Sequence, residues 1–386
     1  MFKTLQEQKF DVIIIGGGVA GSCSAIRLSQ LFESTLPEAA FRKISIIEEK
    51  KDFGTFKVGE SLPSEAKPLL QSLGVLDKII NDVEQGKHLH CFGNTSAWGS
   101  KELHGTDSIF NPYGSGFHLD RSLFEETLLN AAESQFGRFV TVLRGFSVIE
   151  LSFGKEINND DIYWKVMTLP TQVPNPIYGK ILIDASGRRC CIRKFNPNLK
   201  RCSFDKLLSF ACLFESTPKT CKDIPTKDTG SHTLQKIRMI DEFRKLLKEN
   251  ASYINQCIKD YEYHPIGNRI WCLAANSEAL SSFGILTALY NSKIGAEAVF
   301  FQFFHNKRIK MEINQNTYSE KSKNSINQQD DIEIQPIEIY QQKMMKTLND
   351  YRKVKNYFYC KEQRWPDEIF WTRRHFENID NTNMSE

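Results

Sequence analysis

Three glycines at a fixed spacing are the residues of this chain with the clearest chemical use. Gly16, Gly18 and Gly21 follow an apolar run of strand length and precede a helix-like segment, with Val19 and Ala20 between them. Gly16 permits a tight turn, Gly18 lets the backbone approach a pyrophosphate, and Gly21 lets the helix pack closely on the sheet. The helix N-terminus then offers free N–H groups and a partial positive charge to an anion. The spacing predicts a dinucleotide-binding turn; the alternative is a glycine-rich turn without a ligand.

A pair of carboxylates follows the next expected strand, residues 43–47. Glu48 and Glu49 stand at the end of this strand, where a carboxylate can accept hydrogen bonds from a ribose diol and would repel a 2′-phosphate. Glu48 is therefore the candidate ribose ligand, although both residues could be solvated strand-end charges. The separation from Gly21 exceeds the roughly 20 residues usual for this motif, and residues 33–42 read as an insertion.

A third candidate stands at the end of the apolar run 180–183. Asp184 is followed by Ala185, Ser186 and Gly187, and a strand end places such a carboxylate at the ligand edge of an open α/β sheet. Alone, this tetrapeptide is a common turn. Together with the glycine motif, it favours a flavin protein over a nicotinamide-dependent dehydrogenase.

Composition narrows the class of protein. The chain has 386 residues and a net charge of +3, which does not suggest a nucleic-acid-binding surface. The polar N-terminus does not resemble a signal peptide, and no apolar run approaches transmembrane length, so we expect a cytoplasmic protein without a membrane partner. The ten cysteines form no C-x-x-C pair, so we expect reduced thiols and no metal site.

The expected elements divide the chain into six regions. The fold class is α/β: a Rossmann-like FAD-binding domain interleaved with a β-sheet substrate domain, and a helical C-terminal region. Helices are expected at 64–73 and 120–135, strands at 140–151, 162–169 and 207–215, and mainly helices from 237 onward. The regions are 1–80 (nucleotide-binding βαβ unit and following segment), 81–119 (substrate-side sheet), 120–190 (return to the first domain), 191–305 (truncated substrate and FAD region), 306–335 (flexible insertion) and 336–386 (helical C-terminal region).

Several motifs together resemble the FAD-dependent monooxygenases and tryptophan-halogenase-like flavoproteins. The motifs that carry the resemblance are residues 16–21, 59–63, 97–99, 116–121, 184–187 and 280–285, with 362–366 and 370–374 near the end. Within this group the chain is most similar to flavoproteins that hydroxylate a tryptophan during the maturation of peptide-derived quinone cofactors. The match is dense over the first 190 residues and patchy beyond.

The resemblance implies roles for individual residues. Arg121 resembles the arginine that reaches the FAD phosphates or ribose, although it could instead form a salt bridge on its helix face. Glu60 and Ser61 would lie beside the isoalloxazine ring. Gly284 and Ile285 belong to the helix whose N-terminus points at the pyrimidine edge of the flavin. Asp184 and Gly187 would form the second flavin motif.

Two departures from the family pattern concern the flavin ring and the substrate cavity. The family has a strand that ends in Gly-Asp before the helix near Ser282, whereas no Gly-Asp dipeptide occurs in this sequence. A Trp-rich strand expected after Leu234 is replaced by a charged segment. The adenosine half of the site is therefore expected to persist, while the isoalloxazine half is incomplete. An interior strand lost from a parallel sheet would leave backbone groups unpaired.

The expected function is FAD-dependent oxidation, namely hydroxylation of an aromatic or indole substrate. This substrate would be tryptophan-like and either part of a peptide or a small molecule. Electrons would come from NAD(P)H or a flavin reductase. No catalytic residue is assigned; His118, the only histidine in a motif, is read as structural. The alternatives are an FAD-fold pseudoenzyme and, less favoured, a halogenase, since Lys67 falls too soon after Ser61 for the halogenating lysine and no Trp-x-Trp-x-Ile-Pro box is present.

Overall fold

The computed structural model describes ten stretches of the chain that fall into two compact units. The stretches are residues 8–35, 42–52, 57–156, 159–170, 176–200, 208–216, 240–260, 263–274, 283–318 and 335–380. The first unit comprises Met1–Asn198 and Ile285–Glu386, and the second comprises Leu199–Gly284. The region 191–305, expected to be a truncated substrate and FAD region, is divided between the two units. No described helix is long and apolar enough to cross a membrane.

A mixed six-stranded sheet forms the centre of the first unit, with the order β8-β2-β1-β11-β10-β9. Its parallel strands are β1 (Gln8–Ile15), β2 (Ile44–Glu48), β8 (Val140–Arg144) and β11 (Ile177–Asp184). β10 (Asn159–Leu169) and β9 (Ser147–Glu156) continue the sheet in antiparallel pairing. This arrangement confirms the predicted α/β fold with a Rossmann-like core.

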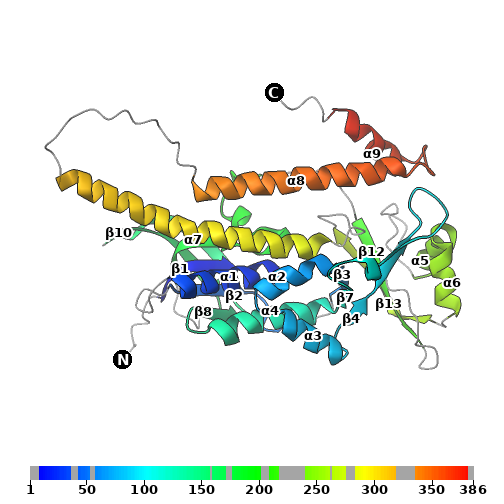
Figure 1. The fold of residues 1–386 in the computed structure, drawn as a ribbon, viewed down its shortest axis with the longest axis horizontal. Helices are drawn as coiled ribbons and strands as arrows, with labels where there is room; N and C mark the ends of the chain where they lie inside the picture. The colour runs from blue at the N-terminus through cyan, green and yellow to red at the C-terminus, as the bar shows by residue number, and fades with distance from the viewer. Residues whose placement is uncertain are drawn as a thin grey trace. The chain divides into compact units, whose positions relative to one another are not determined.

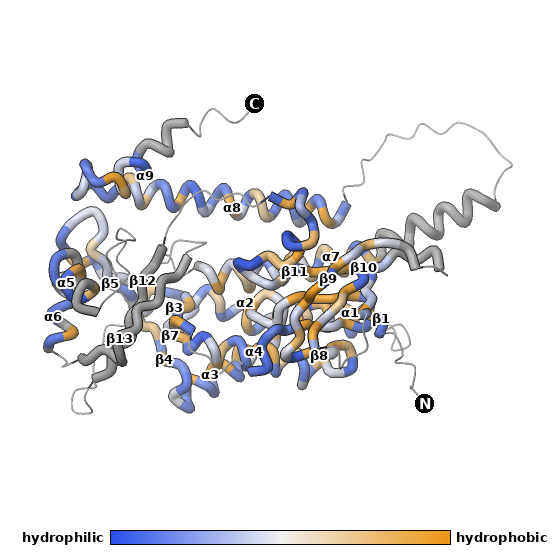
Figure 2. The backbone as a smooth tube through the Cα atoms, turned by 180° about the vertical axis from the view of Figure 1, so that it is seen from behind, coloured by the Kyte–Doolittle hydropathy of each residue, from blue (hydrophilic) through white to orange (hydrophobic). Residues whose placement is uncertain are grey.

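Strand β1 is buried on both of its faces. Val12 and Ile14 belong to one hydrophobic cluster, whereas Ile13 and Ile15 belong to another on the opposite side of the sheet. Successive side chains of a strand point to opposite faces, so a continuous apolar run is what a strand covered on both sides requires. Figure 2 shows hydrophobic residues concentrated along this and the neighbouring strands.

Three helices pack against the Val12 face. They are α1 (Val19–Thr35), α4 (Arg121–Phe136) and α7 (Phe283–Tyr318). Helix α7 lies along α1 (Figure 1), where Arg27 pairs with Glu297 at 2.7 Å and the rings of Phe32 and Phe300 lie 5.8 Å apart. Asp120 begins α4, because its carboxylate accepts hydrogen bonds from the Ser122 and Leu123 N–H groups. The predicted helix at 120–135 is therefore present within one residue at each end.

Short helices and small sheets lie between β2 and α4 in the chain. The short helices are α2 (Lys67–Ser72) and α3 (Leu76–Glu84). β3 (Glu60–Leu62), β7 (Gly116–Leu119) and β4 (Leu89–Cys91) form a three-stranded antiparallel sheet, and β5 (Gly93–Ser96) pairs with β6 (His104–Asp107). Strands therefore occupy the region 81–119, as expected.

The C-terminal helices α8 (Pro336–Lys361) and α9 (Ile369–Asp380) are joined by a segment that docks on residues 97–99. The Trp98 indole donates a hydrogen bond to the Phe358 carbonyl at 2.6 Å, and its ring lies 5.6 Å from that of Trp371. The buried Glu362 accepts a hydrogen bond from the Gly99 N–H at 2.8 Å. Two motifs that are far apart in the sequence thus meet in the structure.

The second unit contains a strand that the sequence did not indicate. β12 (Leu208–Ser216) pairs antiparallel with β13 (Tyr263–Ala274), and α5 (Ile240–Asn250) and α6 (Ser252–Asp260) lie between them in the chain. Helices were expected to dominate from residue 237 onward, and no strand was predicted at residues 263–274; antiparallel pairing with the distant β12 makes this segment a strand. Helix α7 also extends into the segment 306–335, so the expected flexible insertion is helical as far as Tyr318; residues 319–334 lie outside the described residues.

The second half of β11 has one described neighbour. β10 pairs with β11 at residues 177–179, whereas β1 pairs with it as far as Asp184. Among the described residues, no strand continues the sheet beside Ile181–Asp184 on the side away from β1. The sequence contains no Gly-Asp dipeptide, and the described residues place no further strand at this position.

Candidate functional site

Packing explains two of the three motif glycines but not the third. Gly16 has a φ of +101°, and a Cβ atom there would lie 2.5 Å from the Ala185 carbonyl oxygen. A Cβ atom on Gly21 would lie 1.9 Å from the Gly16 carbonyl oxygen. A Cβ atom on Gly18 would meet only the Glu125 Oε2 atom, at 3.8 Å, an ordinary contact. Packing within the fold therefore leaves room for a Cβ atom at Gly18, and the approach of a diphosphate to this glycine stays a prediction.

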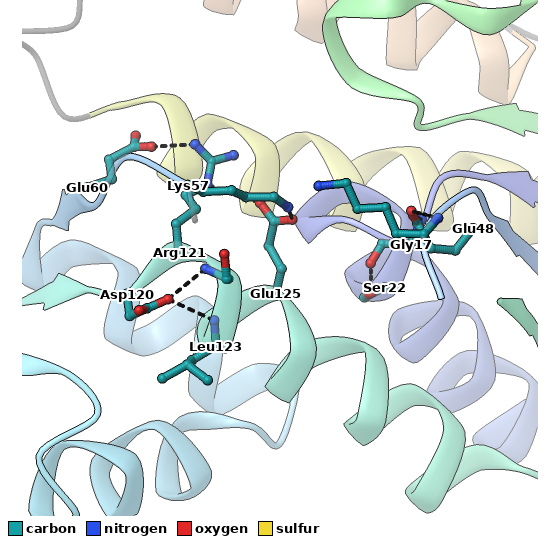
Figure 3. Close-up of polar contacts among 11 residues, drawn as sticks. Gly17, Ser22, Glu48, Lys57, Glu60, Asp120, Arg121, Leu123 and Glu125 are labelled. Atoms are coloured by element: carbon teal, nitrogen blue, oxygen red, sulfur yellow. Dashed lines mark hydrogen bonds and ion pairs between the residues drawn. The ribbon is translucent and has the colours of Figure 1, made fainter. Parts of the chain in front are cut away.

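Glu48 lies directly at the glycine turn. Its carboxylate is buried and accepts hydrogen bonds from the Gly17 N–H at 2.6 Å and the Lys50 N–H at 2.9 Å (Figure 3). The neighbouring Glu49 side chain is 58% exposed and pairs with Arg189. Of the two acidic candidates, only Glu48 is therefore in position to act at the turn, and its contact with a ribose remains a prediction.

Arg121 joins two carboxylates at the start of α4. Its NH1 atom lies 2.8 Å from Glu60 Oε2, and its Nε atom lies 3.1 Å from Glu125 Oε1. Glu60 Oε1 also accepts a hydrogen bond from the Ile285 N–H at 3.3 Å, in the first turn of α7, which also contains Gly284. The helix-face salt bridge considered for Arg121 is thus present, together with a second pair that links α4, β3 and α7.

Lys57 completes this cluster and was not identified from the sequence. Its ammonium group forms an ion pair with Glu125 Oε2, the same oxygen that faces Gly18 (Figure 3). The Glu125 side chain is 6% exposed and that of Lys57 is 24% exposed, so the carboxylate of this pair is largely excluded from water. Glu125 could have been found as the i+4 partner of Arg121, whereas Lys57 has no motif and becomes visible only in the folded chain.

The second motif carboxylate is engaged within its own loop. Asp184 Oδ1 accepts hydrogen bonds from the Ser186 N–H and hydroxyl, and Oδ2 accepts one from the Ile192 N–H at 2.9 Å. Gly187 follows with a φ of +68° and open space around its Cα atom. Asp184 therefore fixes the loop after β11, and a direct flavin contact by Asp184 or Gly187 stays a prediction.

Ser61 and His118 form a cross-strand pair. They oppose each other in the β3–β7 register, and the Ser61 hydroxyl lies 2.9 Å from His118 Nδ1. The half-buried Lys67 donates a hydrogen bond to the Tyr113 carbonyl at 3.0 Å and lies over the Phe117 ring. These contacts connect the strands and the helix next to Glu60.

A buried histidine supports the start of α4. His88 is 2% exposed, and its Nδ1 atom accepts a hydrogen bond from the Asp120 N–H at 3.2 Å. Burial lowers the pKa of His88 below its ordinary value, and the nearby Asp82 and Asp120 carboxylates only partly oppose this effect. The imidazole is thus neutral at pH 7, and its Nδ1 atom can accept the hydrogen bond from the Asp120 backbone N–H.

We predict that the fold loses stability as the pH falls below about 6.5, because the unfolded chain then protonates His88 before the folded chain does. One such group changes the free energy of unfolding by up to about 1.4 kcal/mol per pH unit. His88→Asn keeps an acceptor and should flatten the slope in urea titrations between pH 7 and 5. His90→Asn, at an exposed imidazole, is the matched control; equal slopes for the parent and His88→Asn would contradict the prediction.

Comparison with known proteins finds flavin-dependent enzymes. The tryptophan halogenase family model matches residues 11–89. The FAD-dependent oxidoreductase LodB of Marinomonas mediterranea is 25% identical over 393 residues, which cover 95% of this chain and 97% of that protein. The structure of the myxobacterial chondrochloren halogenase CndH, described as FAD-dependent, superposes with a TM-score of 0.65 at 17% identity, covering 97% of this chain and 88% of that one.

A monooxygenase shares the fold as well. The p-nitrophenol 4-monooxygenase PnpA of Pseudomonas putida superposes with a TM-score of 0.55 at 13% identity, over 76% of this chain and 80% of that one. FAD, the cofactor expected from the motifs, is named for both LodB and the chondrochloren halogenase. The predicted resemblance is confirmed: the chain is similar to a tryptophan halogenase family model over residues 11–89 and to an FAD-dependent oxidoreductase over nearly its whole length, and it has the fold of flavin-dependent halogenases and monooxygenases.

Proposed function

We propose that this chain binds FAD at the carboxyl edge of its parallel strands. The turn of Gly16, Gly18 and Gly21 would receive the diphosphate at the N-terminus of α1, and Glu48 would bind the adenosine ribose. The observation that carries this proposal is the space at Gly18, which packing does not require to be empty and which faces the cluster around Arg121. A carboxylate at Glu48 would disfavour the 2′-phosphate of NADP.

The chain's own residues would fix the far half of the cofactor. Glu60 joins Arg121 to the Ile285 N–H, so it holds β3 against the first turn of α7. The N-terminus of that helix carries a partial positive charge, which suits the pyrimidine edge of a flavin. The Ser61–His118 contact pairs β3 with β7 and limits the movement of the segment beside the ring. Bound FAD would supply the redox chemistry, including activation of oxygen.

We infer that the reaction is monooxygenation of an aromatic or indole ring. The substrate would be tryptophan-like, either within a peptide or as a small molecule, and the electrons would come from NAD(P)H or a flavin reductase. Halogenation is less favoured, because Lys67 is engaged by the Tyr113 carbonyl and the Phe117 ring and the Trp-x-Trp-x-Ile-Pro box is absent. Cys23, Cys91, Cys190, Cys191 and Cys360 are free thiols, which fits a cytoplasmic location.

A second candidate is an FAD-fold protein without turnover. The observation that favours it is the second half of β11, beside which the described residues place no further strand, in a sequence without a Gly-Asp dipeptide. Monooxygenation requires the flavin ring in a water-excluding pocket, and the absent strand would form part of that pocket.

Two measurements on the purified chain test these candidates. We expect a yellow protein, or one that becomes yellow when FAD is added, with an absorption spectrum of bound flavin. If the incomplete half of the site limits catalysis, NAD(P)H-driven oxygen consumption with an indole-bearing peptide should be slower than roughly 1 per second. Faster turnover coupled to a product heavier by one oxygen would exclude the non-catalytic candidate. A chloride-dependent, halogenated product would contradict monooxygenation, and a protein that cannot be reconstituted with FAD would contradict the cofactor assignment.

A further inference from the structure

We propose that Lys57 is a second cation that binds the cofactor diphosphate, and that Glu125 is an internal carboxylate that occupies the place of the diphosphate until the cofactor binds. The inference rests on the proposed function and adds two residues to it. Neither residue belongs to a motif that was recognised in the sequence. Both are defined by their contacts in the folded chain.

The geometry places opposite charges around one carboxylate. Glu125 accepts the Arg121 Nε–H on Oε1 at 3.1 Å and the Lys57 ammonium on Oε2. The same Oε2 lies 3.8 Å from the position of a Cβ atom on Gly18. The carboxylate therefore sits between two side-chain cations and the glycine turn, which is the location where a diphosphate would meet all three (Figure 3).

The charges around Glu125 explain why its carboxylate would have to move when a diphosphate binds. Each of the two cations is already paired with a carboxylate: Lys57 with Glu125, and Arg121 with Glu60 and Glu125. A diphosphate would bring further negative charge next to Glu125 and would repel it. Arg121 can keep Glu60 on its NH1 atom while its remaining N–H groups turn to phosphate oxygens. Glu125 is on a flexible side chain, so it can rotate away without moving α4.

The burial and the second cation partner of Glu125 distinguish it from an ordinary salt bridge on a helix surface. The i,i+4 pair of Arg121 and Glu125 alone could be an ordinary helix-face pair, which is usually exposed and contributes little to stability. Here the Glu125 side chain is 6% exposed and is also paired with a lysine from the segment that leads into β3. A diphosphate at this turn would therefore meet two cations that come from different segments of the chain.

Lys57→Met tests the proposed lysine, with Lys87→Met as the matched control, because Lys87 also pairs with a buried carboxylate, Asp82, at 2.7 Å. We expect Lys57→Met to weaken the binding of both FAD and ADP by about tenfold or more, since a charge-assisted hydrogen bond is lost. Lys57→Arg should restore most of the affinity. Adenosine, which has no phosphate, should bind the parent and Lys57→Met equally, and Lys87→Met should bind FAD like the parent. Affinities come from titration calorimetry, and thermal unfolding shows that each variant is folded.

Glu125→Gln tests the internal carboxylate. We expect it to bind ADP and FAD more tightly than the parent, by about threefold or more, because the competing charge is removed while the shape is kept. Equal ADP affinity of the parent and Lys57→Met, or weaker binding by Glu125→Gln, would overturn this inference while leaving the proposed function in place. A parent chain that binds neither FAD nor ADP would overturn both.

Discussion

A Gly18→Val variant is expected to fold like the parent and to lose the bound cofactor. The added Cβ atom would meet only Glu125 Oε2, at 3.8 Å, so the protein itself tolerates a side chain at this position. The side chain would occupy the space through which the backbone approaches a diphosphate. We expect the dissociation constant for FAD to rise by at least about a hundredfold, which corresponds to roughly 2.7 kcal/mol. Quenching of FAD fluorescence measures the affinity.

The controls for this variant separate binding from folding. Without FAD, the melting temperature of Gly18→Val should stay within about 3 °C of the parent, since no packing contact is lost. Gly21→Ala should instead unfold more readily with or without FAD, because its Cβ atom would lie 1.9 Å from the Gly16 carbonyl oxygen. A Gly18→Val protein that binds FAD as tightly as the parent would show that the turn is not the diphosphate site.

Local sequence patterns predicted the parts of the fold that local interactions determine. The apolar run before Gly16 forms β1, and the run after Asp120 forms α4 because the Asp120 carboxylate caps the helix. The glycine turn was predictable for the same reason, since Gly16 has a backbone conformation that few other residues adopt. In these cases the cause lies within a few residues of the element that it determines.

The features that were missed depend on partners far away in the chain. β13 was not predicted within a region expected to be mainly helical, and its pairing with β12 stabilises it as a strand. Lys57 carries no local signal, because its partner Glu125 is 68 residues away and depends on how β3 and α4 pack together. The helical start of the segment 306–335 was missed for another reason: its Asn-, Gln- and Lys-rich composition reads as disorder, yet Lys and Gln are also good helix formers.

The docking of the C-terminal segment that joins α8 and α9 onto residues 97–99 is expected to depend on the buried carboxylate of Glu362. The Glu362 side chain is fully buried and accepts hydrogen bonds from the Gly99 N–H at 2.8 Å and from Arg364 Nε at 2.8 Å. Arg364 also donates to the Ala97 carbonyl at 2.6 Å. Burial alone would raise the pKa of Glu362, but the hydrogen bonds from Arg364 and Gly99 outweigh it and hold the pKa below its ordinary range. The carboxylate is therefore charged at neutral pH and joins the C-terminal segment to residues 97–99.

Glu362→Ala should lower the free energy of unfolding by about 3–5 kcal/mol, because it leaves the Gly99 N–H without its acceptor and removes the buried charge partner of Arg364, which retains the Ala97 carbonyl. Glu297→Ala is the control, since the Arg27–Glu297 pair has side chains 24% and 28% exposed; its loss should stay below about 1 kcal/mol. Because the folded pKa of Glu362 is depressed, its contribution is present above about pH 4.5 and is lost as the pH falls further. Urea unfolding of both variants at pH 7 and pH 4 measures these differences. If Glu362→Ala costs no more than Glu297→Ala at pH 7, the aromatic contacts around Trp98, rather than this carboxylate, hold the C-terminal segment in place.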